Sequence, residues 1–345
     1  MPERILLIQL RRIGDVLMTT PAVAALREAY PSAHIAYLTE PPSDQLFRHN
    51  RAVDEVIALP RRTSPLALLR LMARLRRGRF DLAIDFHGHP RTALLARASG
   101  ASRRIGLSLR GRTWAYTDSL WPRTEGQTYT ALHKAALLAP LGLPVENLSL
   151  LPRLPLGGPE RDHAAAVLEG LGVGGDDLLV ALSPVSRQPY KVWPAEDFAY
   201  VADMLIERYG AKVLLVWGPG EEHFANAVRL AMTQTALPDY PMPDLLQLAA
   251  LLERCALVVS NDNGPRHFAV AVGTPTVTIF GRPRPENWTP PGLPQHQSMA
   301  YDPGCKDDCT YPRCGLECLE GVSRNAVMAA VESQMEELLA DGTPH

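Results

Sequence analysis

The stretch QLRRIGDVLMTTPAVAALREAYP, residues 9–31, joins a buried-strand pattern to a long helical pattern. It overlaps the end of the apolar run RILLIQL, residues 4–10, and places Gly14 and one acid, Asp15, where the strand would turn into a helix. Gly14 would allow a tight turn and a close approach of a ligand to the backbone. Asp15 would act either as a helix cap or as a base facing a cleft, because open α/β sheets bind ligands at the carboxyl ends of their strands.

The N-terminal half of the chain alternates strand-like and helix-like segments. The strand-like segments are residues 4–10, 34–40, 55–60, 81–88 and 103–107, and helical patterns cover residues 16–30, 64–77 and 90–99. This alternation predicts a parallel sheet covered by helices on both faces.

The C-terminal half repeats the scheme after a segment rich in Pro and Gly, LPRLPLGGPE (residues 151–160), which marks a domain boundary. Strand patterns cover residues 178–184, 212–219, 255–262 and 276–281, and helical patterns cover 194–209, 221–232, 243–253, 264–272 and 323–340. We therefore expect two doubly wound α/β domains, residues 1–155 and 156–345, facing a central cleft. The last helix, residues 323–340, is a candidate to pack back on the N-terminal domain.

The composition is that of a globular protein, with 46% hydrophobic and 21% charged residues. The sequence contains neither an apolar run of about 20 residues nor a signal-peptide pattern, so we expect a cytoplasmic protein. The net charge of −2 hides an excess of nine basic residues in residues 1–150 and of eleven acidic residues in residues 151–345. Such an asymmetry indicates different partners for the two halves.

Four further stretches place polar or glycine-rich segments after predicted strands. They are SPVSRQPYKVWP (183–194), WGPGEEH (217–223), SNDNGPRH (260–267) and FGRP (280–283). A lysine followed by an apolar anchor, as at Lys191, suits a phosphate, and a helix N-terminus after Asp262 offers backbone amides to an anion. The alternatives are a surface lysine, acids that only complement a helix dipole, and a structural histidine at position 267.

The ordered set of motifs resembles glycosyltransferase family 9, the ADP-heptose:lipopolysaccharide heptosyltransferases. The resemblance rests on IGDVLMTTPAVAALREAYP, KVWP, GPGEE and DNGPRHFAVAVGTPTVTIFG, together with RRIG at 103–106 and CLEGVS at 318–323. It implies a GT-B fold with two Rossmann-like domains, an N-terminal one for the acceptor and a C-terminal one for the donor. It also implies metal-independent, inverting transfer of L-glycero-D-manno-heptose from ADP-heptose to the lipopolysaccharide inner core, Kdo-lipid A or heptosyl-Kdo-lipid A.

The resemblance assigns roles to individual residues. Asp15 would be the general base, Lys191 would hold the donor diphosphate, and Glu222 the adenosine ribose. Asp262 would bind heptose hydroxyls. The remaining donor-side candidates are the Asn263 and Gly264 amides and His267 near the phosphates, the Ser186 hydroxyl facing phosphate, and Met242, in the turn Pro241–Pro243, beside the adenine.

The acceptor side is assigned to residues of the basic N-terminal half: Arg12, Gly14, His87, Arg91, Arg70 and Arg74. The last two lie in SPLALLRLMARLRRGR (residues 64–79), where Leu68, Leu71, Met72 and Leu75 form the opposite, apolar face. This face pattern predicts either a core-packing helix with a solvated arginine face or a basic surface for an anionic, membrane-held acceptor. We accordingly expect peripheral contact with the cytoplasmic face of the inner membrane, and no nucleic-acid partner.

The chain departs from the family pattern at two places. Arg282 and Pro283 follow Phe280–Gly281 where the family has a small residue or proline and then Thr or Ser, and His87 stands where a polar or amide residue is common. These departures bear on the donor and the acceptor. A family 9 enzyme that uses another nucleotide-sugar or surface glycan therefore stays an alternative, as does a non-catalytic two-lobed nucleotide-binding protein.

No cofactor or metal is expected. A sugar nucleotide carries its own leaving group, and a carboxylate base, a lysine and a helix N-terminus suffice for the transfer. The cysteines at 305, 309, 314 and 318 are spaced more loosely than zinc knuckles. Their alternatives are reduced thiols, local disulfides or a metal site, and the prediction is that no metal is tightly held.

Overall fold

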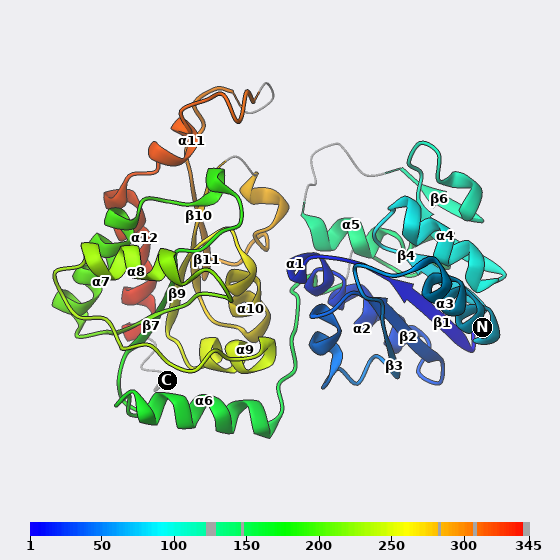
Figure 1. The fold of residues 1–345 in the computed structure, drawn as a ribbon, viewed down its shortest axis with the longest axis horizontal. Helices are drawn as coiled ribbons and strands as arrows, with labels where there is room; N and C mark the ends of the chain where they lie inside the picture. Colours follow the sequence, from blue (N-terminus) through cyan, green and yellow to red (C-terminus); the bar gives the residue numbers. More distant parts are fainter. Residues whose placement is uncertain (122–128, 146–147, 282–283, 306–308, 341–345) are drawn as a thin grey trace. The chain divides into compact units, whose positions relative to one another are not determined.

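The computed structural model describes residues 1–121, 129–145, 148–281, 284–305 and 309–340, and the chain divides into two compact units, Met1–Pro155 and Leu156–His345. Each unit is a parallel sheet with helices on both faces, as the alternating sequence pattern predicts (Figure 1). Among the described residues, no helix is long and apolar enough to cross a membrane.

The first unit contains a six-stranded parallel sheet in the order β3-β2-β1-β4-β5-β6. Its strands are β1 (Arg4–Ile8), β2 (His34–Thr39), β3 (Glu55–Ala58), β4 (Leu82–Asp85), β5 (Arg103–Leu107) and β6 (Asp118–Leu120). Its α-helices are α1 (Ile13–Leu17), α2 (Thr20–Ala29), α3 (Pro65–Arg77), α4 (Pro90–Ser99) and α5 (Thr130–Ala136). Short 3₁₀ turns are η1 (Ser43–Phe47), η2 (Thr113–Ala115) and η3 (Ala139–Leu141).

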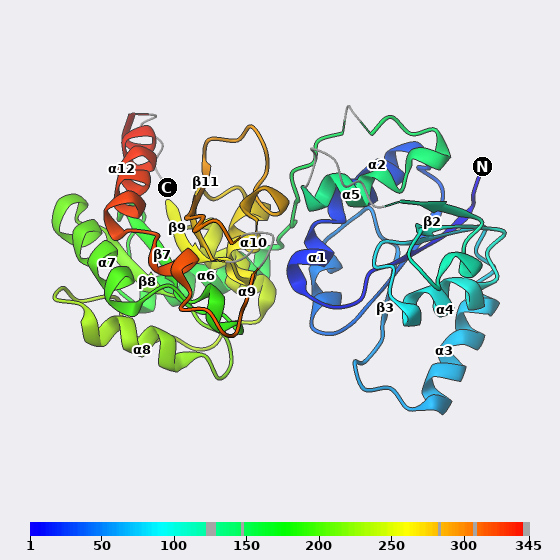
Figure 2. The ribbon, with the colours of Figure 1, turned by 90° about the horizontal axis from the view of Figure 1, so that it is seen from above.

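Figure 2 shows α2 and α5 on one face of this sheet and α3 and α4 on the other. The strands are near-continuous apolar runs because both of their faces are covered, and the side chains of Ile5, Leu6, Leu7 and Ile8 in β1 are completely buried. The single helix expected over residues 16–30 is two helices, and the three-residue strand β6 lacked a sequence signal long enough to predict it.

The second unit contains a five-stranded parallel sheet in the order β11-β10-β9-β7-β8. Its strands are β7 (Leu179–Ser183), β8 (Lys212–Leu215), β9 (Leu257–Asn261), β10 (Thr276–Phe280) and β11 (His296–Ala300). Its α-helices are α6 (Gly158–Gly170), α7 (Ala195–Tyr209), α8 (Glu222–Ala231), α9 (Leu245–Glu253), α10 (Gly264–Val272), α11 (Glu317–Glu320) and α12 (Arg324–Ala340). The 3₁₀ turns are η4 (Pro189–Lys191) and η5 (Pro285–Asn287).

Within this unit, α12 packs against α7 and against the strands β9, β10 and β11. Its residues Val327, Met328, Val331 and Met335 are buried in the same apolar cluster as Phe198 of α7. Trp193, just before α7, is completely buried in this cluster, and its indole N–H donates to the Val322 carbonyl at 2.9 Å. The segment before α12 is thereby tied to the loop that follows β7.

Candidate functional site

Each sheet has one position where the strand order reverses. In the first sheet this switch point lies between β1 and β4, and in the second between β7 and β9. Loops after strands on either side of a switch point diverge to opposite faces and leave a crevice for a ligand. The loops after β1, β4, β7 and β9 carry Asp15, His87, Lys191 and Asp262, so the predicted site residues gather at the switch point of their own unit.

The loop after β1 holds its backbone in an uncommon conformation. Arg11 and Arg12 have φ of 64° and 41°, in the left-handed region that costs non-glycine residues energy and is concentrated at functional sites. Gly14 was expected to make this turn, and that expectation is wrong, since Gly14 lies inside α1 and the two arginines make the turn.

Asp15 is the third residue of α1, and it is half-buried. The N-cap position belongs to Arg12, whose side chain makes no capping hydrogen bond and is exposed. The carboxylate of Asp15 therefore belongs to the first turn of α1 and not to its N-cap position.

Lys134, from α5, braces the same region, and sequence reasoning missed it. Its Nζ donates to the Gln9 Oε1 at 2.9 Å and to the Phe86 carbonyl at 2.6 Å, so it ties the end of β1 to the end of β4. Burial lowers the pKa of the Lys134 ammonium, and the negative charges of Asp15 and Asp85 act to raise it. Lys134 thus places a positive charge within electrostatic range of Asp15. Its surroundings, TALHKAAL (residues 130–137), are mostly small and apolar, so the sequence does not single it out.

A buried carboxylate shapes the loop after β4. Asp85 is completely buried and accepts hydrogen bonds from the Tyr116 hydroxyl at 2.7 Å and from the backbone N–H groups of His87 and Gly88 at 2.9 and 3.1 Å. Burial raises the pKa of Asp85, and these hydrogen bonds oppose the rise. Asp85 is an acid at the end of a strand-like run, as Asp262 is, and this position is the sequence signal that could have identified it.

His87 points its Nδ1 toward the Gln9 side-chain amide nitrogen, 3.4 Å away. Burial, followed by the charge of Lys134, lowers the pKa of His87 to about 4. The imidazole is therefore neutral at neutral pH and can exchange hydrogen bonds with a neutral ligand group rather than attract an anion.

The other arginines that are predicted for the acceptor side include Arg91 and Arg74, which contact residues other than Asp15. Arg91 contacts Glu40 at 3.4 Å and donates to the carbonyls of Pro60 and Arg61, so it braces the loop before α3. Arg74 pairs with Glu55 at 2.7 Å, and Arg70 is exposed on α3.

A cavity of about 450 Å³ opens beside Lys134, at the carboxyl ends of β4, β5 and β6. Its wall includes Phe86, Leu107, Leu120 and Leu137, and Lys134 and His133 supply polar groups. A cavity of this size and mixed lining suits a small organic group rather than a bare ion.

In the second unit, Lys191 and Asp262 form an ion pair between the loops after β7 and β9. The Lys191 and Asp262 side chains are 16% and 4% exposed, so the pair is largely shielded from water. A buried pair of this kind holds its two members in place, and removal of one partner leaves an uncompensated charge. The structure therefore brings together the two residues predicted for the donor phosphate and sugar.

Two asparagines hold these loops in position. Asn261 accepts a hydrogen bond from the Trp193 backbone N–H at 3.1 Å and donates to the Pro184 carbonyl at 2.7 Å. Asn263 donates from Nδ2 to the carbonyls of Ser183 and Val185 at 3.2 and 3.0 Å. Asn263 is predicted to contribute its backbone amide to the site, and its side chain holds the loop after β7 in position.

Asn263 is also the N-cap of α10, and its Oδ1 accepts from the Arg266 backbone N–H at 3.2 Å. Gly264 is the first helical residue, and its backbone N–H follows Asp262 closely in the chain. Pro265 has no N–H, and the Arg266 N–H is taken by the cap. His267, one turn further, is 7% exposed, and its Nδ1 has no hydrogen-bond partner in the described parts of the chain. Burial, followed by the charge of Arg266, lowers the pKa of His267 to about 3.

The loop after β10 packs tightly against the lysine loop. A Cβ on Gly281 would lie 2.1 Å from the Tyr190 carbonyl oxygen, so only glycine permits this approach of the two backbones. Arg282 and Pro283, which mark a departure from the family pattern, lie outside the described residues.

The remaining donor-side candidates flank this centre. Ser186 is buried, and its Oγ accepts from the Gln188 N–H at 3.2 Å. Glu222 begins α8 and is exposed, at the end of β8 next to β7. Met242 is 43% exposed, in a segment that Tyr240 attaches to the end of β8 by contacting Trp217.

The cysteine-rich segment contacts the lysine loop, because the Tyr311 ring packs edge-on against the Tyr190 ring with their centroids 4.9 Å apart. Cys305, Cys309, Cys314 and Cys318 are free, half-buried thiols, and burial is the main cause that raises the pKa of Cys318. In the described ranges, no three His, Cys, Asp or Glu side chains are arranged to hold a metal ion.

The burial of His267 leads to a prediction about how the free energy of unfolding depends on pH. The unfolded chain binds a proton at this residue near pH 6.5, whereas the folded chain does so only near pH 3, so the unfolded state gains protons first as the pH falls. Proton uptake by His267 in the unfolded state should therefore lower the free energy of unfolding by about 2 kcal/mol between about pH 7 and about pH 5. Urea unfolding at both pH values should show a smaller pH-dependent loss in His267→Gln than in the parent.

The exposed His223 provides the matched control, since His223→Gln should leave the pH dependence of the parent unchanged. An equal loss in His267→Gln and the parent would contradict the neutral, buried state of His267.

The comparisons with known proteins agree with this architecture. Residues 68–313 match the model of the family described as "Glycosyltransferase family 9 (heptosyltransferase)". Lipopolysaccharide heptosyltransferase 3 of Escherichia coli is 26% identical over 298 residues, which cover 80% of this chain and 83% of the relative.

Two solved structures show the same fold. The crystal structure of a family 9 glycosyl transferase from Veillonella parvula DSM 2008 superposes with a TM-score of 0.87 at 26% identity, covering 97% of this chain and 98% of the other. An E. coli heptosyltransferase solved with ADP-2-deoxy-2-fluoro heptose gives a TM-score of 0.71 at 19% identity, covering 96% and 99%.

Two parallel α/β units with ligand loops at their switch points, in a chain with these relatives, define a glycosyltransferase of the GT-B fold. The chain belongs to glycosyltransferase family 9, the heptosyltransferase family. It is therefore a glycosyltransferase.

Proposed function

We propose that this enzyme transfers L-glycero-D-manno-heptose from ADP-heptose to the lipopolysaccharide inner core, Kdo-lipid A or heptosyl-Kdo-lipid A, with inversion at the anomeric carbon. The observation that carries the donor assignment is the Lys191–Asp262 pair beside the N-terminus of α10. A cation, a helix N-terminus and a carboxylate in one place are the groups that a diphosphate joined to a polyhydroxyl sugar requires.

The donor would displace the Lys191–Asp262 ion pair. Lys191 would exchange its contact with Asp262 for the diphosphate, and the released Asp262 carboxylate would accept hydrogen bonds from heptose hydroxyls. The Asn263 and Gly264 backbone amides and the neutral His267 would contact the phosphates, and Ser186 would donate its hydroxyl there. Glu222 and Met242, both near the end of β8, would contact the ribose and the adenine.

The reaction needs a base and a stabilised leaving group. Asp15 would take the proton of the acceptor hydroxyl as its oxygen forms a bond to the anomeric carbon of heptose. The bond from that carbon to the diphosphate breaks, and ADP leaves with the electron pair. Lys191 and the α10 amides would stabilise the charge that develops on ADP.

The acceptor would bind to the N-terminal unit. Arg12 is exposed beside Asp15, and the cavity next to Lys134 can receive an organic group of the acceptor. We also propose a cytoplasmic location with peripheral contact at the inner membrane, where the lipid-linked acceptor resides.

The donor is tested by offering the purified enzyme a panel of nucleotide-sugars with Kdo-lipid A and heptosyl-Kdo-lipid A, and weighing the products by mass spectrometry. Addition of one heptose from ADP-heptose is the expected result. Efficient transfer of a different sugar, with none from ADP-heptose, would replace the donor and retain the family. Nucleotide binding without transfer or hydrolysis of any donor would favour the non-catalytic alternative.

The ion pair is tested by Lys191→Ala, Asp262→Ala and the double variant. Lys191→Ala should lower turnover as well as donor affinity, because lysine would act on the departing diphosphate. It should also destabilise the fold by about 1–3 kcal/mol, because the buried Asp262 loses its counter-charge. The double variant should be more stable than Lys191→Ala in urea unfolding, while it remains impaired in transfer.

Arg208→Ala is the control for this set, since it removes an exposed ion pair with Glu332 in the same unit and should change neither property substantially. Parent-like transfer by both Lys191→Ala and Asp262→Ala would show that the donor centre is elsewhere.

Asp15→Asn separates a base from a structural carboxylate. The amide retains the size and hydrogen-bonding capacity of the side chain but cannot accept the acceptor proton at neutral pH. We expect a folded protein with near-parent affinity for ADP-heptose and transfer slowed at least ~10²-fold. Isothermal titration with ADP-heptose and single-turnover assays measure the two properties, and near-parent transfer would remove Asp15 from the mechanism.

A further inference from the structure

Helix α3 has two apolar stripes on opposite faces. The inward stripe, Leu68, Leu71, Met72 and Leu75, packs against the core of the first unit, as the sequence pattern predicts. The outward stripe is formed by Leu66 and Leu69, whose exposed fractions are 57% and 60%. These two residues are three positions apart and therefore share one side of the helix.

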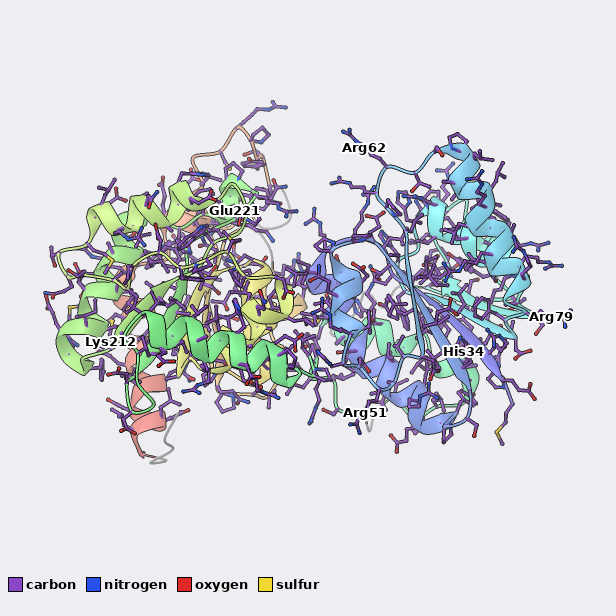
Figure 3. The ribbon with its side chains drawn as sticks, turned by 60° about the horizontal axis from the view of Figure 1, so that its bottom comes forward. His34, Arg51, Arg62, Arg79, Lys212 and Glu221 are labelled. Carbon is purple, nitrogen blue, oxygen red and sulfur yellow. The ribbon has the colours of Figure 1, made fainter. Side chains whose placement is uncertain are left out.

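The first half of α3 projects from its unit. In residues 65–70 every residue except the half-buried Leu68 is exposed, whereas Leu75, near the other end of the helix, is completely buried. Figure 2 shows this end of α3 and the loop before it reaching away from the sheet, and Figure 3 shows the Arg62 side chain extending outward from that loop.

The surroundings of the two leucines are strongly basic. Residues 56–80 contain seven arginines and no acidic residue. Arg61 and Arg62, in the loop before α3, and Arg70, on α3 itself, are exposed. Arg74, further along α3, is partly neutralised by Glu55.

We propose that Leu66 and Leu69, framed by Arg61, Arg62 and Arg70, form an insertion site for an anionic lipid bilayer. The leucines would enter the boundary between headgroups and acyl chains, and the arginines would bind lipid phosphates while their stems lie along the apolar layer. Neither an apolar anchor nor a polybasic patch alone attaches a protein firmly to a membrane. The two together do so, and this surface contains both. This inference names the surface that would make the peripheral membrane contact included in the proposed function. It rests on the proposed function only because the lipid-linked acceptor is what would bring the enzyme to a bilayer.

A bilayer fits this surface better than a protein partner. Two leucines on a projecting half-helix offer far less than the roughly 800 Å² per partner that a stable protein interface buries. The run of arginines without acids would repel a second copy of the same surface, whereas it complements phosphatidylglycerol.

The test uses the whole protein and vesicles of phosphatidylcholine with and without phosphatidylglycerol, in flotation assays at low and high salt. The parent should bind the anionic vesicles. Leu66→Ser/Leu69→Ser should lower the partition coefficient roughly 10-fold at either salt concentration, because an apolar contribution is not screened. Arg61→Gln/Arg62→Gln/Arg70→Gln should lower it at low salt and have a smaller effect at high salt.

Leu230→Ser is the matched control, since this leucine is 88% exposed on α8 of the other unit and should leave binding unchanged. Thermal unfolding should be the same in all the leucine variants, because the substituted side chains are exposed. Parent-like partitioning of Leu66→Ser/Leu69→Ser would overturn the proposal. Loss of a parent dimer in that variant, without any vesicle binding by the parent, would also overturn it and favour a second copy.

The flotation assay contains neither donor nor acceptor, so its outcome is independent of the proposed reaction. Heptosyl transfer to a delipidated core oligosaccharide, measured in parallel, should be equal in the parent and in Leu66→Ser/Leu69→Ser. Absence of that transfer in the parent would count against the proposed function and leave the bilayer result standing.

Discussion

Parallel pairing of the strands is the constraint on which both units depend. It brings the carboxyl ends of all strands of a sheet to one edge, and the reversal of strand order opens a crevice at one point of that edge. Residues distant in sequence, such as Lys191 and Asp262, then come into contact because β7 and β9 are neighbours. The same reason places Gln9, after β1, beside His87, after β4.

Buried polar groups turn these crevices into defined sites. Asp85 organises the loop after β4 by accepting from the Tyr116 hydroxyl and two backbone amides, and Asn261 and Asn263 attach the loop after β7 to the end of β9. Such groups are expensive to bury unless they are hydrogen-bonded, so the loops that satisfy them are held in one conformation. The two units use this device with different residues, an acid in the first and two amides in the second.

The charges at the two switch points differ in a way that suits a two-substrate enzyme. In the second unit Lys191 is paired with Asp262, so a diphosphate would have to compete with an existing partner. The first unit sets Asp15 within electrostatic range of the Lys134 ammonium. An ionised acid is the form that can accept a proton from an alcohol.

The fold class and most elements could be predicted from the sequence, because buried strands are short apolar runs and the helices between them have clear periodicity. Strand β5 (residues 103–107) and helix α10 (residues 264–272) have the bounds that were expected. The short strand β6 and the helix α6, which begins within a segment rich in Pro and Gly, were missed because local composition gave no periodic signal.

The sequence by itself also determined which residues of the candidate site to consider: Asp15, Lys191, Asp262 and His267 each follow a strand in a recognisable motif. Only the tertiary structure decided how they are held. The bracing by Lys134, the left-handed turn at Arg11 and Arg12, and the outward leucines of α3 depend on neighbours supplied by distant segments. A sequence pattern reports the period of burial along one element, whereas the identity of the group that covers or charges a side chain is set by packing between elements.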